Sequence, residues 1–233
     1  MNLQKELRID KCHALVLDKR FNDWQNKKDQ LKKIGLEIKD FIVGDGKCPY
    51  LKYNRIDTND FPPKYSNSIN YATWYKYNNA YNAFLSHQQM IKEASKEGVQ
   101  TLLLLEDDIV LNKNYQEIVK DIVKHINYVN YDLLCLGGFY QLYNLFQILP
   151  SKYLYRTIGN GGFHAIVIRQ TLFDFYINHL PTGPMDWITE EKIQKNYANY
   201  FCVAVHPSLI LQESNYSYVE HSYLNREEDL TGF

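Results

Sequence analysis

The chain has 233 residues, of which 45% are hydrophobic, and a formal net charge of -1. This length suits one large α/β domain and is short for two, so we expect a single domain over residues 1–233. The nearly neutral charge supplies no basic field, which argues against nucleic acid as a partner. The four cysteines form no CxxC pair, and no apolar leader or membrane-length run is present. We therefore expect a soluble cytoplasmic protein, in a host cytoplasm if the chain is viral.

The first hundred residues begin with the pattern of a nucleotide-binding sheet. An apolar run over 13–17, an amphipathic stretch over 24–34 and an alternating stretch over 36–43 predict a strand, a helix and a second strand. Asp18 and Asp45 follow the two strands, at the edge of an open α/β sheet where ligands gather. Each could touch a ribose or a base edge, or be an ordinary turn carboxylate.

A helix is then predicted over residues 81–94, which include Ser86 and His87. Neighbouring residues of a helix point about 100° apart, so these two side chains do not form a nucleophile and base by themselves. A hydrogen-bonded structural role is the commoner one for His87, unless the start of the helix faces a ligand.

The most informative segment is an apolar run, 101–105, that stops at Glu106, Asp107 and Asp108. The run predicts a strand buried on both faces. Three adjacent carboxylates resist desolvation, so at the end of a core strand they are tolerable mainly when a cation or strong donors neutralise them. Strand alternation places Glu106 and Asp108 on one side and Asp107 on the other. Two converging carboxylates suit Mg²⁺ or Mn²⁺; the alternative is a solvated acidic turn.

The second half of the chain continues with short strands and helices. Glycines at 159–162 do not form a phosphate-binding loop, because a strand rather than a helix follows them. They would instead let the backbone pass close to a sugar. The predicted helices cover 115–126, 171–180 and a stretch from 185, and the predicted strands cover 132–138, 153–158, 163–168, 200–207 and 209–212.

Several short segments, in this order, resemble glycosyltransferase family 25, which includes bacterial lipooligosaccharide galactosyltransferases and collagen hydroxylysine galactosyltransferase domains. The resemblance covers nearly the whole chain, from about residue 12 to about residue 217. Its most specific part is the Leu-Ser-His helix followed some twenty residues later by Leu-Glu-Asp-Asp. The segments are Leu17-Asp18-Lys19-Arg20, Gly44-Asp45-Gly46, Phe84-Leu85-Ser86-His87, Leu105-Glu106-Asp107-Asp108, Gly162-Phe163 and Pro207-Ser208-Leu209 through Gln212.

This resemblance implies an α/β fold of the GT-A type, with a central, mostly parallel sheet flanked by helices. The N-terminal half would bind the donor and the C-terminal half the acceptor. The implied reaction is the metal-dependent transfer of a hexose, galactose or glucose, from a UDP-sugar to a hydroxyl group, with inversion. Mn²⁺ or Mg²⁺ would be the cofactor, and the acceptor a glycan, a lipid-linked sugar or a protein.

The resemblance also implies roles for particular residues. Asp108 would ligate the metal ion, Glu106 would assist or touch the ribose, and His206 would be a third ligand, with His221 as the alternative. The donor-binding residues would be Leu17, Asp18, Lys19, Gly44, Asp45, Gly46, Ser86, His87, Glu106, Asp107 and Gly162.

An inverting transferase also needs a base for the acceptor hydroxyl, and Asp186 matches an acid that follows a proline-rich turn in collagen-modifying members. An N-cap is the equal alternative for Asp186, and Glu190 and then Glu191 are the next candidates for the base. The family usually has Gly-Glu-Ile-Gly-Cys where this chain has Tyr81-Asn82-Ala83-Phe84. A relative that binds nucleotide-sugar or glycan without turnover is therefore the alternative function. Metal-dependent phosphoryl or nucleotidyl transfer is a third.

Overall fold

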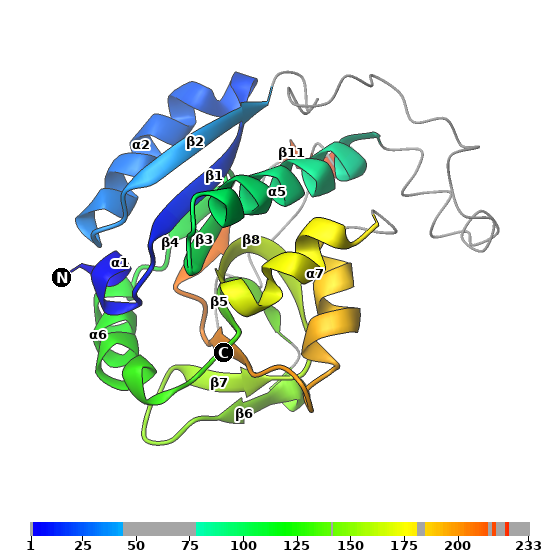
Figure 1. The fold of residues 1–233 in the computed structure, drawn as a ribbon. Helices are drawn as coiled ribbons and strands as arrows, with labels where there is room; N and C mark the ends of the chain where they lie inside the picture. The colour runs from blue at the N-terminus through cyan, green and yellow to red at the C-terminus, as the bar shows by residue number, and fades with distance from the viewer. Residues whose placement is uncertain are drawn as a thin grey trace.

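An eight-stranded sheet forms the centre of the molecule, with helices on both of its faces (Figure 1). The computed structural model describes residues 2–43, 78–140, 142–180, 185–213, 216–217 and 222–223. The strand order is β2-β1-β3-β8-β5-β9-β7-β6. The predicted α/β fold, with a central sheet flanked by helices, is confirmed by this arrangement. The sheet is mixed rather than mostly parallel, because four of its seven strand pairs are antiparallel.

The first half of the chain builds the parallel side of the sheet. β1 lies between β2 and β3 and is parallel to both. The predicted strand, helix and strand are confirmed as β1, α2 and β2. Because Leu15 of β1 pairs with Glu106 of β3, both strands end at the same edge of the sheet. The elements are α1 (Leu3–Glu6), β1 (Lys11–Leu17), α2 (Phe21–Lys33), β2 (Ile38–Val43), α5 (Asn78–Lys96) and β3 (Thr101–Glu106).

The second half makes the sheet a mixed one. β8 (Asn160–Arg169) is antiparallel to both of its neighbours, β3 and β5 (Leu133–Tyr140). Since Leu105 pairs with Ala165, the residues before Ala165 run past the end of β3. The start of β8 therefore lies at the edge where β1 and β3 end.

The remaining elements complete the sheet and its cover. β9 (Cys202–Val205) is parallel to β5, whereas β7 (Leu154–Thr157) is antiparallel to β9 and β6 (Leu145–Gln147). β4 (Ile109–Leu111) and β10 (Ile210–Gln212) form a separate antiparallel pair beside the acidic residues. Also present are α6 (Tyr115–His125), α7 (Phe173–Asn178), α8 (Met185–Thr189) with a π-helical turn over Glu190–Gln194, and the short pair β11 (Tyr216–Ser217) and β12 (Ser222–Tyr223).

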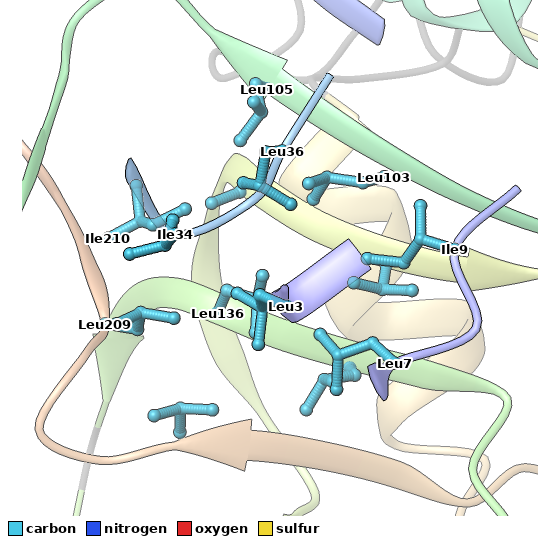
Figure 2. Close-up of a cluster of buried hydrophobic side chains, with 14 of the residues drawn as sticks. Leu3, Leu7, Ile9, Ile34, Leu36, Leu103, Leu105, Leu136, Leu209 and Ile210 are labelled. Atoms are coloured by element: carbon cyan, nitrogen blue, oxygen red, sulfur yellow. The ribbon is translucent and has the colours of Figure 1, made fainter. Parts of the chain in front are cut away.

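The core has two layers, one on each face of the sheet. Alternate leucines of β3 point into one layer or the other. Leu103 and Leu105 belong to a cluster with residues of α1, α2 and α6, part of which is shown in Figure 2. Leu102 and Leu104 pack on the opposite face with residues of α5, α7 and α8. All four leucines are fully buried, so β3 is covered on both faces, as its unbroken apolar run predicts. No helix in the described part of the chain is both long and apolar enough to cross a membrane.

Candidate active site

The three acidic residues lie at the end of β3, where the chain turns from the core toward β4. Glu106 is the last residue of β3, and Asp107 and Asp108 form the turn. β4 pairs with β10, and the backbone N–H of Glu213 donates a hydrogen bond of 2.7 Å to the Asp108 carbonyl. The main chain is thus held on both sides of Asp108.

Asp107 is directed toward β1. Its Oδ2 accepts a hydrogen bond of 2.7 Å from the backbone N–H of Leu17, and its Oδ1 accepts one of 3.0 Å from Arg20. Burial raises the pKa of Asp107 to about 6, although the Arg20 charge and the Leu17 hydrogen bond act in the opposite direction. Asp107 is therefore bound to the end of β1 and to the turn that follows it.

Glu106 and Asp108 lie where their surroundings compensate negative charge poorly. Partial burial raises the pKa of Glu106 well above its usual range, and the Asp108 carboxylate raises it further. Asp108 accepts a hydrogen bond of 3.0 Å at Oδ2 from Gln212, and Arg20 Nη1 lies 3.7 Å from the same oxygen. Its Oδ1 is buried without a hydrogen-bond partner in the described part of the chain.

Asp186 approaches this pair from the other half of the chain. It is the second residue of α8 rather than the residue before the helix, so the predicted N-cap position is not the observed one. The backbone N–H of Gly162 lies 3.4 Å from Asp186 Oδ2, and Gly162 has a φ of +87°, which favours glycine. The Asp186 charge is close enough to Glu106 to raise its pKa. The structure thus brings Glu106, Asp108, Asp186 and Gly162 to one place.

His87 borders the same site from α5. Its Nε2 lies 3.6 Å from Glu106 Oε1, and its ring packs edge-on against Phe163 at 5.0 Å between centroids. Burial lowers the pKa of His87 to about 4. A neutral imidazole supplies no positive charge to Glu106, so it does not neutralise the acidic cluster. The adjacent Ser86 is also buried.

The predicted donor-binding turn lies beside Asp107. Asp18 and Lys19 belong to the 3-10 turn Asp18–Arg20, directly after β1, and Lys19 is exposed. The predicted donor contacts at Gly44, Asp45 and Gly46 lie outside the described residues.

Other predicted residues have partners outside the acidic cluster. Glu190 is in the π-helical turn after α8, where its carboxylate is 3.4 Å from the ammonium group of Lys195. Glu191 pairs with Lys195 as well. The ring of His206 packs edge-on against Tyr155 of β7, and two strands, β8 and β5, separate β9 from β3. His221 lies outside the described residues.

The fit of a divalent cation can be judged from the carboxylates themselves. Among the residues with described positions, no three His, Cys, Asp or Glu side chains form a group able to hold a metal ion, so His206 does not complete a set with Glu106 and Asp108. Mg²⁺ is usually held by only one or two carboxylates, together with water and substrate phosphates. The Oδ1 of Asp108 has no partner among the described residues, and burial and neighbouring acids raise the pKa of Glu106. A divalent cation would offset both effects, so the pair fits such an ion.

Four further residues support the acids and were not predicted. Arg20 contacts Asp107 and Asp108, and Gln212 contacts Asp108. Lys27 donates to the Asp107 carbonyl at 3.0 Å and pairs with Glu213 at 2.5 Å. Arg20 and Gln212 each end a segment that carries the family resemblance, which was the available signal for them. The pairing of β4 with β10, which brings Gln212 and Glu213 to the acids, has no local signal in the sequence.

The structure places an acidic cluster at the carboxyl end of a core strand, where the resemblance to glycosyltransferase family 25 implies the donor and metal site. Residues 82–158 match the family model described as Glycosyltransferase family 25 (LPS biosynthesis protein). This match includes His87 and all three acids, but it ends before Asp186. It confirms the predicted resemblance to this family over these residues, about a third of the chain, and supports a glycosyltransferase.

The solved structures that are similar to this chain include the following two. A glycosyltransferase involved in the glycosylation of the major capsid of PBCV-1 is 10% identical, with a TM-score of 0.42; the match covers 95% of this chain and 98% of that one. A197 from STIV is 11% identical, with a TM-score of 0.39, and the match covers 86% and 83% of the two chains. No curated protein matches the sequence.

Proposed function

We propose that this protein is a metal-dependent glycosyltransferase that moves a hexose, galactose or glucose, from a UDP-sugar to a hydroxyl acceptor with inversion. The acceptor would be a glycan, a lipid-linked sugar or a protein. The family match over residues 82–158 supports transfer of a sugar, and the arrangement of acids supports the metal and the base.

One observation carries the proposal. Carboxylates from two distant parts of the sequence, Glu106 with Asp108 and Asp186, come together at the edge of the sheet. Burial and the charges of the other two acids raise the pKa of Glu106. A fold without a use for this cluster would gain stability by replacing one of the acids. Gathering like charges at a partly buried place is typical of binding and catalytic sites.

Glu106 and Asp108 would hold the Mn²⁺ or Mg²⁺ ion. When bound, such an ion acts as a Lewis acid and offsets the charge that builds on a leaving diphosphate. The protein's own contribution is to fix the two carboxylates: β3 ends at Glu106, and the β4–β10 pair holds Asp108 through Gln212 and the Glu213 amide.

Asp186 is the group we assign to accept the proton of the acceptor hydroxyl. It stands on a different element from the other two acids, and the backbone N–H of Gly162 lies 3.4 Å from its Oδ2. The carboxylate is fixed by the amide of Trp187, which donates a hydrogen bond of 2.8 Å to Oδ1. An acceptor that enters beside Gly162 would meet this base, with the donor on the side of Glu106 and Asp108.

The test is UDP release from a panel of UDP-sugars, with and without Mn²⁺, for the wild type and for Asp108→Asn. Asp29→Asn removes an exposed carboxylate on α2 and serves as the matched control. We expect metal-dependent release that Asp108→Asn lowers by about a hundredfold or more, equivalent to about 2.7 kcal/mol, while the control is unaffected.

Two other results would contradict the proposal in different ways. UDP binding without release, on any donor or acceptor, would indicate a binding protein without turnover. Release of pyrophosphate instead of UDP would indicate nucleotidyl transfer.

A further inference from the structure

The middle acid of the motif differs from its two neighbours in how its oxygens are used. Asp107 is only 5% exposed, and each of its carboxylate oxygens accepts a hydrogen bond, one of 2.7 Å from the Leu17 amide and one of 3.0 Å from Arg20. Its carbonyl oxygen accepts a third hydrogen bond, from the buried ammonium group of Lys27. All of these donors belong to β1, to the turn after it or to α2.

Asp108 shows the opposite pattern. Its Oδ1 is buried without a hydrogen-bond partner in the described part of the chain, and its charge raises the pKa of Glu106. The motif therefore contains two acids that face the site and one that faces away from it. A metal ion or a donor sugar would have to displace the Leu17 amide or the Arg20 guanidinium before it could reach Asp107.

The hydrogen bond to Leu17 joins two neighbouring strands at the point where they end. β1 and β3 are paired up to Leu15 and Glu106, and Asp107 extends the connection to Leu17, the last residue of β1. The next three residues form the turn Asp18–Arg20, and Arg20 returns to Asp107. Both ends of this turn are therefore tied to one carboxylate.

A consequence is that Arg20 is held next to the acids. Its Nη1 is 3.0 Å from Asp107 Oδ1 and 3.7 Å from Asp108 Oδ2. A guanidinium group suits phosphate oxygens, because its planar set of N–H donors matches their geometry. A diphosphate that approaches a metal ion on Asp108 would pass within reach of this group.

We infer that Asp107 is a positioning residue, which holds Arg20 in place to bind the diphosphate of the donor, and that Asp107 itself touches neither the metal ion nor the donor. The inference rests on the proposed function, because it assumes a nucleoside diphosphate ligand. It adds Arg20 to the donor-binding residues and gives Asp107 a role different from that of Asp108.

The experiment compares Asp107→Asn, Arg20→Gln, their double variant and Asp108→Asn. Mn²⁺ binding is measured without nucleotide, by the electron paramagnetic resonance of free Mn²⁺, and UDP binding is measured by calorimetry with Mn²⁺ present. Asp40→Asn is the matched control, since Asp40 makes similar contacts with Trp24 and Lys28 away from the site.

We expect Asp107→Asn to keep Mn²⁺ affinity within about twofold, whereas Asp108→Asn loses it. UDP affinity should fall about tenfold or more in both Asp107→Asn and Arg20→Gln, because a charge-assisted hydrogen bond to phosphate is lost or misplaced. The double variant should be no worse than Arg20→Gln alone, since Asp107 acts through Arg20. The control should match the wild type in every measurement.

Amide hydrogen exchange at Leu17, in protein without ligand, provides a readout that does not depend on nucleotide binding. It should be faster in Asp107→Asn than in the wild type, and unchanged in Asp40→Asn. Failure of the wild type to bind UDP would refute the proposed function, while unchanged exchange at Leu17 would refute the positioning role.

The inference is also overturned if Asp107→Asn loses Mn²⁺ as Asp108→Asn does, or if the effects of Asp107→Asn and Arg20→Gln on UDP binding add. Should Asp107→Asn fail to fold, Arg20→Gln and Arg20→Lys decide the role of the guanidinium: unchanged UDP affinity in Arg20→Gln overturns the inference. Partial recovery in Arg20→Lys supports it.

Discussion

Burial of His13 should make the stability of this protein depend on pH. His13 lies in β1 with no exposed surface, its ring is 4.8 Å from that of Phe41, and neither ring nitrogen has a hydrogen-bond partner in the described part of the chain. Burial, assisted by the charge of Lys39, lowers its pKa from 6.5 to about 4. The folded protein therefore holds His13 neutral at a pH where the unfolded chain would protonate it.

The sign and size of the effect follow from this pKa. The contribution of neutral His13 to stability is fully present above the unfolded pKa of 6.5, and it is lost as the pH falls through the folded pKa of about 4. A pKa difference of about 2.5, at about 1.36 kcal/mol for each pH unit, amounts to about 3 kcal/mol. This is a large part of the free energy of unfolding of a typical folded domain, which is roughly 5–15 kcal/mol.

The assay is urea unfolding of the wild type and of His13→Leu at about pH 7 and about pH 4.5. Leucine has no titrating group and leaves no nitrogen unpartnered, so between these two pH values His13→Leu should lose about 2 kcal/mol less than the wild type, because the full effect is reached only below the folded pKa. The wild type and His13→Leu are compared because burial lowers the pKa of His87 as well. His87 therefore adds the same pH dependence to the stability of both proteins, and only their difference reports on His13. An equal loss in the two proteins would refute the reasoning.

Three further predictions concern the site and its supports. Asp186→Asn should lower kcat by about 10²- to 10⁴-fold with little change in the KM for the donor, in steady-state kinetics; an equal loss of donor binding would count against its role as the base. Gly137→Ala should lower the free energy of unfolding, measured in urea, by about 1–3 kcal/mol or more. A Cβ at this position would lie 2.2 Å from the Ile210 carbonyl oxygen and 2.4 Å from His164 Nε2. Unchanged stability would show that β10 is free to shift. Glu106→Gln should raise the melting temperature of the metal-free protein near neutral pH and remove its stabilisation by Mn²⁺. The raised pKa of Glu106 means that its ionised form destabilises the fold, so a lower melting temperature without metal would contradict this account.

Much of this fold is encoded in local patterns that the sequence displays. The apolar run before Glu106 predicts a strand covered on both faces, and the structure buries its leucines in two separate clusters. Period-two alternation also predicts that Asp107 turns away from its neighbours, and its carboxylate does contact Leu17 of β1. These features depend only on neighbours in the chain, which is why they can be predicted.

Features that depend on long-range pairing could not be predicted in the same way. Asp186 approaches Glu106 because β8 inserts between β3 and β5 in the antiparallel direction, and no local pattern specifies that direction. The edge strand β6 has few buried residues, so its sequence resembles a loop. Arg20 and Gln212 reach the acids through contacts between segments that are far apart in the chain.

The most direct test of the central claim is a crystal structure with UDP and Mn²⁺, with anomalous scattering used to locate the metal ion. We predict one strong anomalous peak bound to Asp108, with the diphosphate of UDP on its other side and Arg20 beside the phosphates. A metal ion elsewhere, or UDP bound without any ion at the end of β3, would contradict the account.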